Sequence, residues 1–507
     1  MSSRYYDVVV LGTELAPLTC ATLLAKRGFR VLVLGQDDPE PSYSVGQFTL
    51  PRRLFQCAFG QTPVSQRVFS ELGLGPGVRR LSRSVDPAFQ IAVPGHRFDV
   101  ALCDTELQRT FEREFPEVRR SIDDFHRRVD HVMRGLDAVF DRDLVLPPET
   151  FFERQRFSRA RRKLARPRAG REDDILAEFP DDHAFRSVAN LPARFEGGID
   201  PGQFSPLRLL RLYGNCRRGA LAFHGGMSMF RELLVQKLRA HSGQLRVEER
   251  ADEIVVQRAE AIGLRLAHSG DEIACAFVVL GVDVNRLPHW LPDRSVLEGL
   301  FERVGEPMVR HYRYTLNVVL RKSGMPAGLG SNLYFQSERP GSGGGRELHV
   351  CSQNLDADHA LICVEALLPA RKVEDDPGFI ARLREECLES LRELIPFLDQ
   401  HIVLVDSPHD GRAPDGEHKK LSAAQVARRG SLTMPAVYSY PLVSNLGLCA
   451  LPIRTPVKRL LLCNSQLVPG LGSEGQLLAA CSTARVITWA DRSRSWMRRR
   501  LWAKVEM

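Results

Sequence analysis

Residues 6–17 read YDVVVLGTELAP, and this stretch decides the fold. Its first six residues form a nearly continuous apolar run, which is typical of a parallel strand buried on both faces. A turn follows at Gly12, the spacing over Leu15–Lys26 predicts a buried helix, and Phe29–Leu34 predicts a second buried strand. A strand, a helix and a strand in this order are the usual start of a dinucleotide-binding domain.

The turn departs from the pattern Gly-x-Gly-x-x-Gly that holds a dinucleotide. Gly12 is kept, but Glu14 stands at the second glycine position and Pro17 at the third. The second glycine lets the backbone approach a pyrophosphate, so Glu14 brings bulk and a like charge to the closest contact. Proline is tolerated in the first turn of a helix, which makes Pro17 the milder change.

The end of the second strand lacks the acid that normally binds a ribose. Gly35 stands at that position, and Gln36 or Asp37 could take over the role by a shift of one or two residues. Two interpretations stay open. Either the turn at Gly12 binds a dinucleotide in an adjusted pose, or the fold is retained with an empty or repurposed groove, and the altered residues favour the second.

The composition indicates a soluble globular protein. The chain has 507 residues, of which 43% are hydrophobic and 26% charged, enough for two or three sub-domains with a large shared core. No run approaches the length of a membrane-spanning helix, and no leader sequence is expected, because the first strand begins at once. Eleven cysteines without a C-x-x-C pair predict reduced thiols in a cytoplasmic protein, with neither a disulfide framework nor a metal site.

The positive charge is concentrated in two stretches. Arg154–Arg171 carries nine basic residues and Arg492–Arg500 five arginines, so the remaining net charge is 8 − 14 = −6. The second stretch lies among Trp489, Trp496 and Trp502, and tryptophan beside arginine suits the boundary between water and lipid. We therefore expect a peripheral contact with an anionic membrane surface at its inner face. The alternative for the first stretch is a solvated loop or a basic face for a protein partner, and the alternative for the second is a terminal helix packed on the body of the protein. The first stretch has few aromatic residues to stack on nucleic acid.

Further motifs follow in a recognisable order. Phe89–Val100 predicts a hairpin that turns at Pro94-Gly95, Phe223–Met227 (FHGGM) opens a helix, Glu272–Leu280 predicts a buried strand, and Pro469–Gly475 reads PGLGSEG near the C-terminus. Together with the opening stretch, these motifs resemble the phytoene desaturase and flavin amine oxidase superfamily over most of the chain.

This resemblance implies FAD as the cofactor, held along a Rossmann-like domain, with an apolar substrate in a second domain. The implied cofactor contacts fall on Gly12, Thr13, Glu14, Gly35, Gly472 and Gly475. Several of these positions are altered, and Ser465 stands where the resemblance implies an acid. The helix start at Gly472–Gly475 is intact and can still present N–H groups to a ligand. The sequence identifies no catalytic residue.

The expected fold class is α/β, with a Rossmann-like FAD-type dinucleotide-binding domain and a second substrate domain of mixed sheet and helices. The first domain is predicted to combine residues 1–100, 223–291 and 452–507. The second combines residues 101–222 and 292–451, with the basic stretch at 154–171.

Two functions are carried forward. The altered FAD positions favour a flavin-free binding or scaffold protein for a hydrophobic ligand, such as an isoprenoid or lipid, or for a protein partner. The alternative is an FAD-dependent oxidoreductase of the desaturase, dehydrogenase or isomerase type, acting on a hydrophobic isoprenoid or lipid substrate at the membrane surface.

Overall fold

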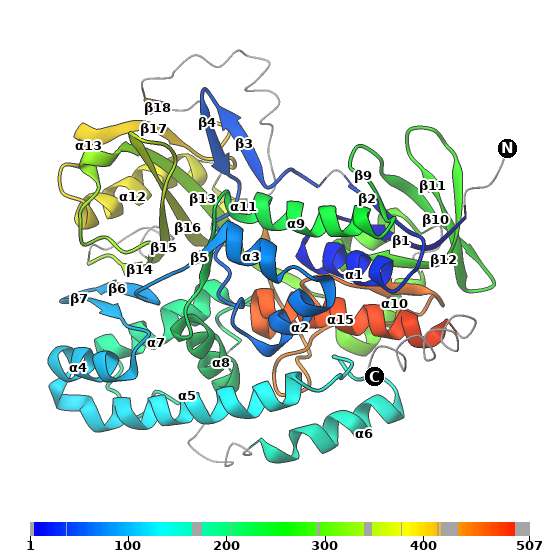
Figure 1. The fold of residues 1–507 in the computed structure, drawn as a ribbon, viewed down its shortest axis with the longest axis horizontal. Helices are drawn as coiled ribbons and strands as arrows, with labels where there is room; N and C mark the ends of the chain where they lie inside the picture. Colours follow the sequence, from blue (N-terminus) through cyan, green and yellow to red (C-terminus); the bar gives the residue numbers. More distant parts are fainter. Residues whose placement is uncertain are drawn as a thin grey trace.

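Two β-sheets, each with its own helices, organise the chain (Figure 1). The computed structural model describes residues 5–36, 38–164, 175–203, 205–291, 295–338, 347–376, 378–412, 415–416 and 434–491. The fold is α/β, with a Rossmann-like FAD-type domain and a second domain of mixed sheet and helices, as the sequence predicts.

The first sheet grows from the opening strand of the chain. Its order is β10-β11-β12-β1-β2-β9, with β20 paired to β12. The strands are β1 (Tyr5–Leu11), β2 (Val31–Leu34), β9 (Gln244–Arg246), β10 (Ala251–Gln257), β11 (Glu260–Leu266), β12 (Glu272–Leu280) and β20 (Leu460–Leu462). β1 runs parallel to both β2 and β12, which confirms the predicted opening and the return of the later strand.

Helices bury the apolar faces of this sheet. They are α1 (Leu15–Lys26), α2 (Pro63–Leu72), α3 (Gly75–Leu81), α9 (Gly226–Ala240) and α15 (Gly472–Ala490). α1 packs against both α9 and α15, and eleven of its twelve residues are buried. Burial on every side explains why the α1 sequence is apolar throughout and lacks an amphipathic period.

The second sheet is mostly antiparallel. Its order is β18-β17-β13-β16-β15-β14-β6-β7, with β19 paired to β13. The strands are β6 (Phe89–Val93), β7 (His96–Val100), β13 (Met308–Arg321), β14 (Asn332–Gln336), β15 (Glu347–Asn354), β16 (His359–Pro369), β17 (Ile402–Asp406), β18 (Asp415–Gly416) and β19 (Ala436–Ser439). One face packs on α12 in a hydrophobic core, and the opposite face carries polar residues.

The predicted hairpin over Phe89–Val100 forms, but in the other sheet from the one expected. The prediction assigned residues 1–100 to the Rossmann-like domain, whereas β6 pairs in parallel with β14 through Leu333↔Gln90 and its neighbours. The strand pattern specifies the hairpin itself, and its partner strand lies more than two hundred residues away in the sequence.

The remaining elements complete the second domain and the links between the two. The helices are α4 (Asp104–Glu114), α5 (Arg119–Phe140), α6 (Phe151–Ala160), α7 (Ala184–Glu196), α8 (Pro206–Arg217), α10 (Ser295–Val304), α11 (Ala370–Asp375), α12 (Phe379–Leu394) and α13 (Leu398–His401). Two further sheets have two antiparallel strands each: β3 (Ser42–Val45) pairs with β4 (Phe48–Pro51), and β5 (Ser82–Ser84) pairs with the distant β8 (Leu221–Phe223). Across the described ranges, no helix has both the length and the apolarity needed to cross a bilayer.

Candidate functional site

The turn between β1 and α1 has the geometry of a dinucleotide-binding turn. Gly12 adopts φ +105°, a conformation that side chains rarely allow, and its N–H donates to the carbonyl of Leu34 at 2.9 Å. The predicted role of Gly12 in a tight turn therefore agrees with its backbone conformation. The residues that surround this turn differ from those of a pyrophosphate site.

The carboxylate of Asp38 accepts the hydrogen bonds that the donors of this turn would otherwise offer to a ligand. Its Oδ2 accepts a hydrogen bond from the backbone N–H of Thr13 at 2.6 Å and a second from the Thr13 hydroxyl at 3.2 Å. Burial and then the neighbouring Glu14 carboxylate raise the pKa of Asp38 to about 6. Gln36 and Asp37 were the residues expected to take the acid role, and Asp38 was not among them. Asp37 itself lies outside the described residues.

Gly35 is held by packing against the backbone of another segment. A Cβ at this position would lie 2.0 Å from the carbonyl oxygen of Val247, which follows β9. No side chain, and therefore no ribose-binding acid, fits there. The absence of an acid at position 35 therefore goes together with the close approach of the Val247 backbone, because that backbone leaves no room for a side chain.

Pro17 changes a second close contact of the fold. A Cβ on Gly281, at the end of β12, would lie 2.3 Å from the Cβ of Pro17. The proline ring therefore fills the space between helix and sheet, and the glycine that permits close packing stands on the opposite side, at position 281. This change is compatible with the fold, as expected from the sequence.

Glu14 points to the mouth of the site. Its carboxylate pairs with Arg53 at 3.0 Å, and both side chains are about half exposed. An exposed pair of this kind contributes little free energy, so Arg53 provides only weak compensation for the negative charge beside the turn. The Gly12 turn is consequently bordered by two carboxylates, those of Glu14 and Asp38.

The N-terminus of α15 lines the same site from the other side. A Cβ on Gly472, at φ +53°, would lie 1.9 Å from the carbonyl oxygen of Glu196, and one on Gly475 would lie 2.0 Å from that of Val468. Both glycines are thus required by close backbone packing. Ser465, Gly472 and Ser473 all face the cavity described below, whereas Gly475 does not line it.

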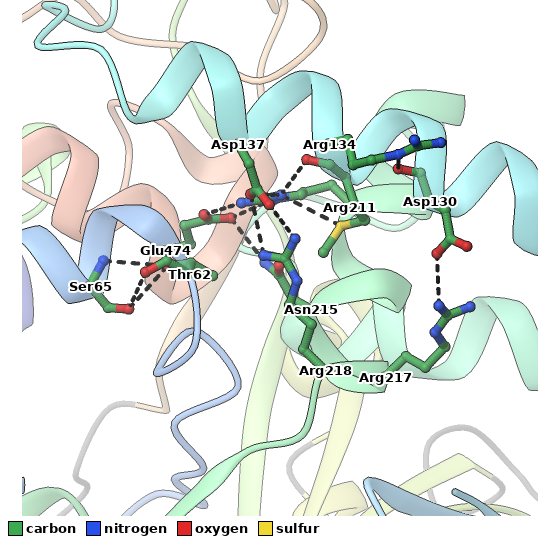
Figure 2. A network of polar contacts seen from close by, with 11 residues as sticks. Thr62, Ser65, Asp130, Arg134, Asp137, Arg211, Asn215, Arg217, Arg218 and Glu474 are labelled. Carbon is green, nitrogen blue, oxygen red and sulfur yellow. Dashed lines mark hydrogen bonds and ion pairs between the residues drawn. The ribbon is translucent and has the colours of Figure 1, made fainter. Parts of the chain in front are cut away.

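A buried ionic network fixes α15 against α8 and α5 (Figure 2). Glu474 is 1% exposed and accepts hydrogen bonds from Arg211 at 2.5 and 2.9 Å and from Asn215 at 2.9 Å. Arg211, fully buried, also donates to Asp137 at 2.6 Å, and Asp137 in turn pairs with Arg218. The network joins the first turn of α15 to α8 and α5 at the wall of the site.

A cavity of about 240 Å³ lies between the Gly12 turn, α9, the start of α15 and the polar face of the second sheet. Its wall combines apolar side chains with charged ones. The apolar members include Leu18, Phe55, Met227, Phe230 and Val437. The charged members are Glu14, Asp38, Glu40, Arg52, Arg53, Glu196, Arg231, Arg313 and Glu365.

A row of buried polar residues comes from adjacent strands of the second sheet, and two members of this row, His349 and Glu365, line the cavity. Tyr334 of β14 lies opposite His349 of β15, and His349 lies opposite Glu365 of β16. Residues that face one another across neighbouring strands share one face of a sheet. The strand register therefore assembles this row, and sequence analysis missed it because the three residues belong to separate strands with no common motif.

Two buried carboxyl groups define the electrostatics of this wall. Arg313 pairs with Glu365 and also donates to the backbone carbonyls of Phe195 at 2.8 Å and Gly197 at 2.6 Å. Glu196 accepts a hydrogen bond from the Tyr334 hydroxyl at 3.2 Å. Burial, followed by repulsion from Glu365, raises the pKa of Glu196 to about 7, so this carboxyl can gain or lose a proton near neutral pH.

His349 is a neutral member of the same wall. Its Nε2 lies 2.8 Å from the Asn332 Oδ1, and its ring stacks on Tyr334 with centroids 4.4 Å apart. Burial and then the charge of Arg313 lower the pKa of His349 to about 3. Since the neutral imidazole donates from Nε2 to the amide oxygen, its role here is hydrogen bonding without charge.

The residues of the Gly12 turn do not fit the pyrophosphate and ribose of FAD. The Thr13 N–H already donates to Asp38, Gly35 is closed by the Val247 carbonyl, and Glu14 adds a second negative charge. The cavity is also smaller than the roughly 300–1,000 Å³ of pockets for drug-sized ligands. We therefore derive no chemical step through a flavin.

The fold is similar to that of solved oxidoreductase structures. No protein-family model and no curated protein matches the chain. Among solved structures, it is similar to an oxidoreductase from Methanosarcina mazei, at 13% identity and TM-score 0.60 over 94% of this chain and 100% of that one.

Two further structures give the same result. A putrescine oxidase with redesigned cofactor binding is 15% identical, with TM-score 0.59 over 96% of this chain and 99% of its own. The PF1083 protein from Pyrococcus furiosus is 13% identical, with TM-score 0.56 over 95% and 97%. At these identities the comparisons establish the fold alone, and it is the two-domain α/β fold expected from the sequence.

The cysteines and the groups that could bind a metal ion were compared with this site. All eleven cysteines are free thiols, and ten of them are buried or half-buried. Within the described part of the chain, no group of three or more histidine, cysteine, aspartate or glutamate side chains is arranged to hold a metal ion.

Proposed function

We propose that this chain is a flavin-free binding protein built on the FAD-type oxidoreductase fold, with a small ligand held between its two domains. The single observation that carries this proposal is the 2.6 Å hydrogen bond from the Thr13 N–H to the Asp38 carboxylate. It uses the backbone donor of the dinucleotide-binding turn and puts an anionic group where the turn would receive a phosphate.

The cavity favours a compact ligand with an apolar part and a hydrogen-bonding part. Phe55, Met227 and Phe230 supply apolar contacts, while Glu196 and His349 supply polar ones. A volume of about 240 Å³ is small for the isoprenoid or lipid considered from the sequence. A ligand with an amine or hydroxyl group suits Glu196, because its pKa of about 7 lets it accept either a hydrogen bond or a proton.

Flavin content tests this proposal first. The visible absorbance of freshly purified protein is measured, and apoprotein is then titrated with FAD while flavin fluorescence is followed. We expect a colourless protein that does not quench added FAD. A stoichiometric flavin spectrum, or saturable quenching, would contradict the proposal.

The second candidate is an FAD-dependent oxidoreductase that acts on a hydrophobic substrate. The fold shared with an oxidoreductase and with putrescine oxidase favours it, as does the position of the α15 start at the cavity wall. Under this alternative the flavin titration saturates, and reduction of the bound flavin by candidate substrates can be followed by the loss of its visible absorbance.

We also propose a contact with an anionic membrane surface through α6. Phe151 and Phe152 are each 72% exposed at the start of this helix, and Arg154, Arg156 and Arg159 are exposed behind them. Exposed aromatic side chains next to arginines suit insertion at the headgroup level. The guanidinium of Arg156 lies 5.4 Å from the ring centroid of Trp489, so the end of α15 adjoins this surface.

Part of the predicted membrane contact falls outside the described residues. This holds for 165–171 of the basic stretch and for 492–507, including Trp496 and Trp502. The proposal therefore rests on α6 and Trp489, and a protein partner is the competing occupant of this surface.

A further inference from the structure

A second pocket, of about 540 Å³, lies between α7, the start of α8 and β15. In the described part of the chain it shares no lining residue with the interdomain cavity. Its size falls within the usual range for small-molecule sites. One part of its wall is apolar and includes Leu176, Leu191 and Leu209, and the other carries three arginines and the two carboxylates of Asp181 and Glu347.

Arg208 is the decisive residue of this pocket. It is 7% exposed, its Nη1 is buried, and no hydrogen bond or ion pair joins its side chain to any other residue that the structure describes. Burial lowers the pKa of Arg208 to about 10 against the opposing charge of Asp200, which acts on the guanidinium without forming an ion pair with it. The guanidinium is therefore charged at neutral pH. Buried charges in proteins are normally paired, because an unpaired one loses its hydration without compensation.

The other two arginines are already occupied. Arg186 donates to the carbonyls of Leu176 at 2.5 Å and Phe179 at 3.0 Å. Arg194 lies 3.0 Å from the carboxylate of Glu347. Arg186 also lies 3.5 Å from the carboxylate of Asp181. Asp181 and Glu347 both line the pocket, so these two pairs add little net positive charge, and Arg208 is the arginine of the three that retains its hydrogen-bonding capacity for a ligand.

The N-terminus of α8 meets the same pocket. Ser205 precedes the helix and lines the pocket, its side chain makes no capping hydrogen bond, and the first turn contains no acidic residue. N–H groups in the first turn of a helix lack partners within the helix and attract anions. Arg208 lies in this turn, so the unpaired guanidinium and the positive end of the helix act on the same space.

We propose that this pocket binds a small organic anion, whose carboxylate or phosphate group contacts Arg208 and the first turn of α8 and whose apolar part lies against Leu176, Leu191 and Leu209. Arginine suits both groups because its planar fork donates two parallel hydrogen bonds to oxyanions. The proposal is independent of whether the interdomain cavity holds a flavin.

Calorimetric titration of the full-length protein with phenyl phosphate, benzoate and inorganic phosphate tests this site, with sodium chloride at equal ionic strength as the blank. We expect saturable binding of phenyl phosphate or benzoate, tighter than that of inorganic phosphate because of the apolar wall. Whichever of the two aromatic anions binds more tightly identifies the head group as phosphate or carboxylate.

The variants locate the site. Arg208→Met is expected to weaken binding at least about tenfold, since charged hydrogen bonds are lost, and to unfold in the absence of anions at a temperature no lower than that of the unmodified protein. Arg208→Lys, which keeps the charge and loses the fork, is expected to bind with intermediate affinity. Arg217→Met is the matched control, at the far end of the same helix and paired with Asp130 at 2.7 Å, and is expected to bind unchanged.

Two results would overturn the proposal. One is the absence of saturable binding of all three anions to the unmodified protein. The other is binding by Arg208→Met, or by Arg208→Lys if the first variant does not fold, with the affinity of the unmodified protein.

Discussion

At the scale of single residues, protein atoms stand in the places where a dinucleotide would make its contacts with this site. Asp38 takes the Thr13 N–H, and the Val247 carbonyl takes the space beside Gly35. These replacements are contributed by residues that no fingerprint includes. They act together, so reversing one of them leaves the others in place.

The first prediction concerns Glu14. Glu14→Gly restores the second glycine of the turn, yet we expect no tight FAD binding, because Asp38 still occupies the Thr13 N–H and Gly35 is still closed. The measurement is the FAD fluorescence titration described above. Saturable binding by Glu14→Gly alone would show that bulk and charge at position 14 were the main obstacle.

The second prediction concerns the titration of Asp38. Its pKa of about 6 in the folded protein lies above the ordinary value of 3.8, so the folded state holds this proton more tightly than the unfolded chain. The stability contributed by the protonated carboxyl is therefore lost as pH rises from about 4 through 6. Asp38→Asn removes this loss.

Urea unfolding at two pH values measures the effect. Between about pH 4.5 and pH 7, we expect the free energy of unfolding of Asp38→Asn to gain about 2 kcal/mol relative to the unmodified protein. A difference between the two proteins that is the same at both pH values would contradict the raised pKa.

The third prediction concerns Gly35. Gly35→Ala places a Cβ 2.0 Å from a backbone carbonyl that cannot rotate away, so we expect a loss of about 3 kcal/mol in the free energy of unfolding. Gly299→Ala in α10 is the control: nothing lies within 4 Å of its added Cβ, and alanine favours a helix by about 0.5–1 kcal/mol. Equal effects of the two substitutions in thermal unfolding would refute the packing explanation for Gly35.

At the scale of elements, a buried ion pair between α15 and α8 fixes the position of α15. Glu474 and Arg211 are 1% and 0% exposed and join α15 to α8, while Asp137 extends the network to α5 (Figure 2). Helix N-termini favour acids in their first turn, which accounts for part of the preference for Glu474. The remainder comes from the buried guanidinium opposite it.

The fourth prediction follows from this pair. Glu474→Leu and Arg211→Met each leave a buried charge with fewer partners, and we expect each to cost about 3–5 kcal/mol in the free energy of unfolding. The double variant is expected to cost less than the sum of the two, with a coupling of about 1–3 kcal/mol. Chemical unfolding of all four proteins measures the coupling, and strictly additive effects would count against a direct interaction.

At the scale of the whole molecule, the binding cavity and the proposed membrane surface lie in different places. The cavity is lined by residues of both domains. By contrast, α6 and the end of α15 lie side by side at one edge of the molecule, where the guanidinium of Arg156 lies over the Trp489 ring (Figure 1). The exposed arginines of α6 carry part of the net charge of +8.

The fifth prediction tests this surface by sedimentation with vesicles of phosphatidylserine and phosphatidylcholine. Phe151→Ser with Phe152→Ser is expected to reduce the bound fraction at least about tenfold in partition coefficient, because two apolar side chains are removed from the headgroup region. Phe397→Ser is the matched control, since Phe397 is 74% exposed on a different part of the surface. Absence of binding by the unmodified protein, or equal binding by all variants, would argue for a protein partner instead.

The sequence by itself determined the strand–helix–strand opening, the α/β fold class and the altered residues at Glu14, Pro17 and Gly35. These features depend on residues close together in the chain, whose periodicity and backbone preferences act locally. It also indicated that a pyrophosphate placed at this turn would meet a carboxylate, because that inference needs only the identity of residue 14.

Only the tertiary structure decided what replaces the missing groups. Asp38 reaches Thr13 across 25 residues, the row of Tyr334, His349 and Glu365 is set by strand register, and the Phe89–Val100 hairpin joins β14. The tertiary structure likewise decided that the buried Nη1 of Arg208 has no hydrogen-bond partner among the described residues. Contacts between distant segments depend on how the sheets and helices pack, and no local pattern in the chain encodes that packing.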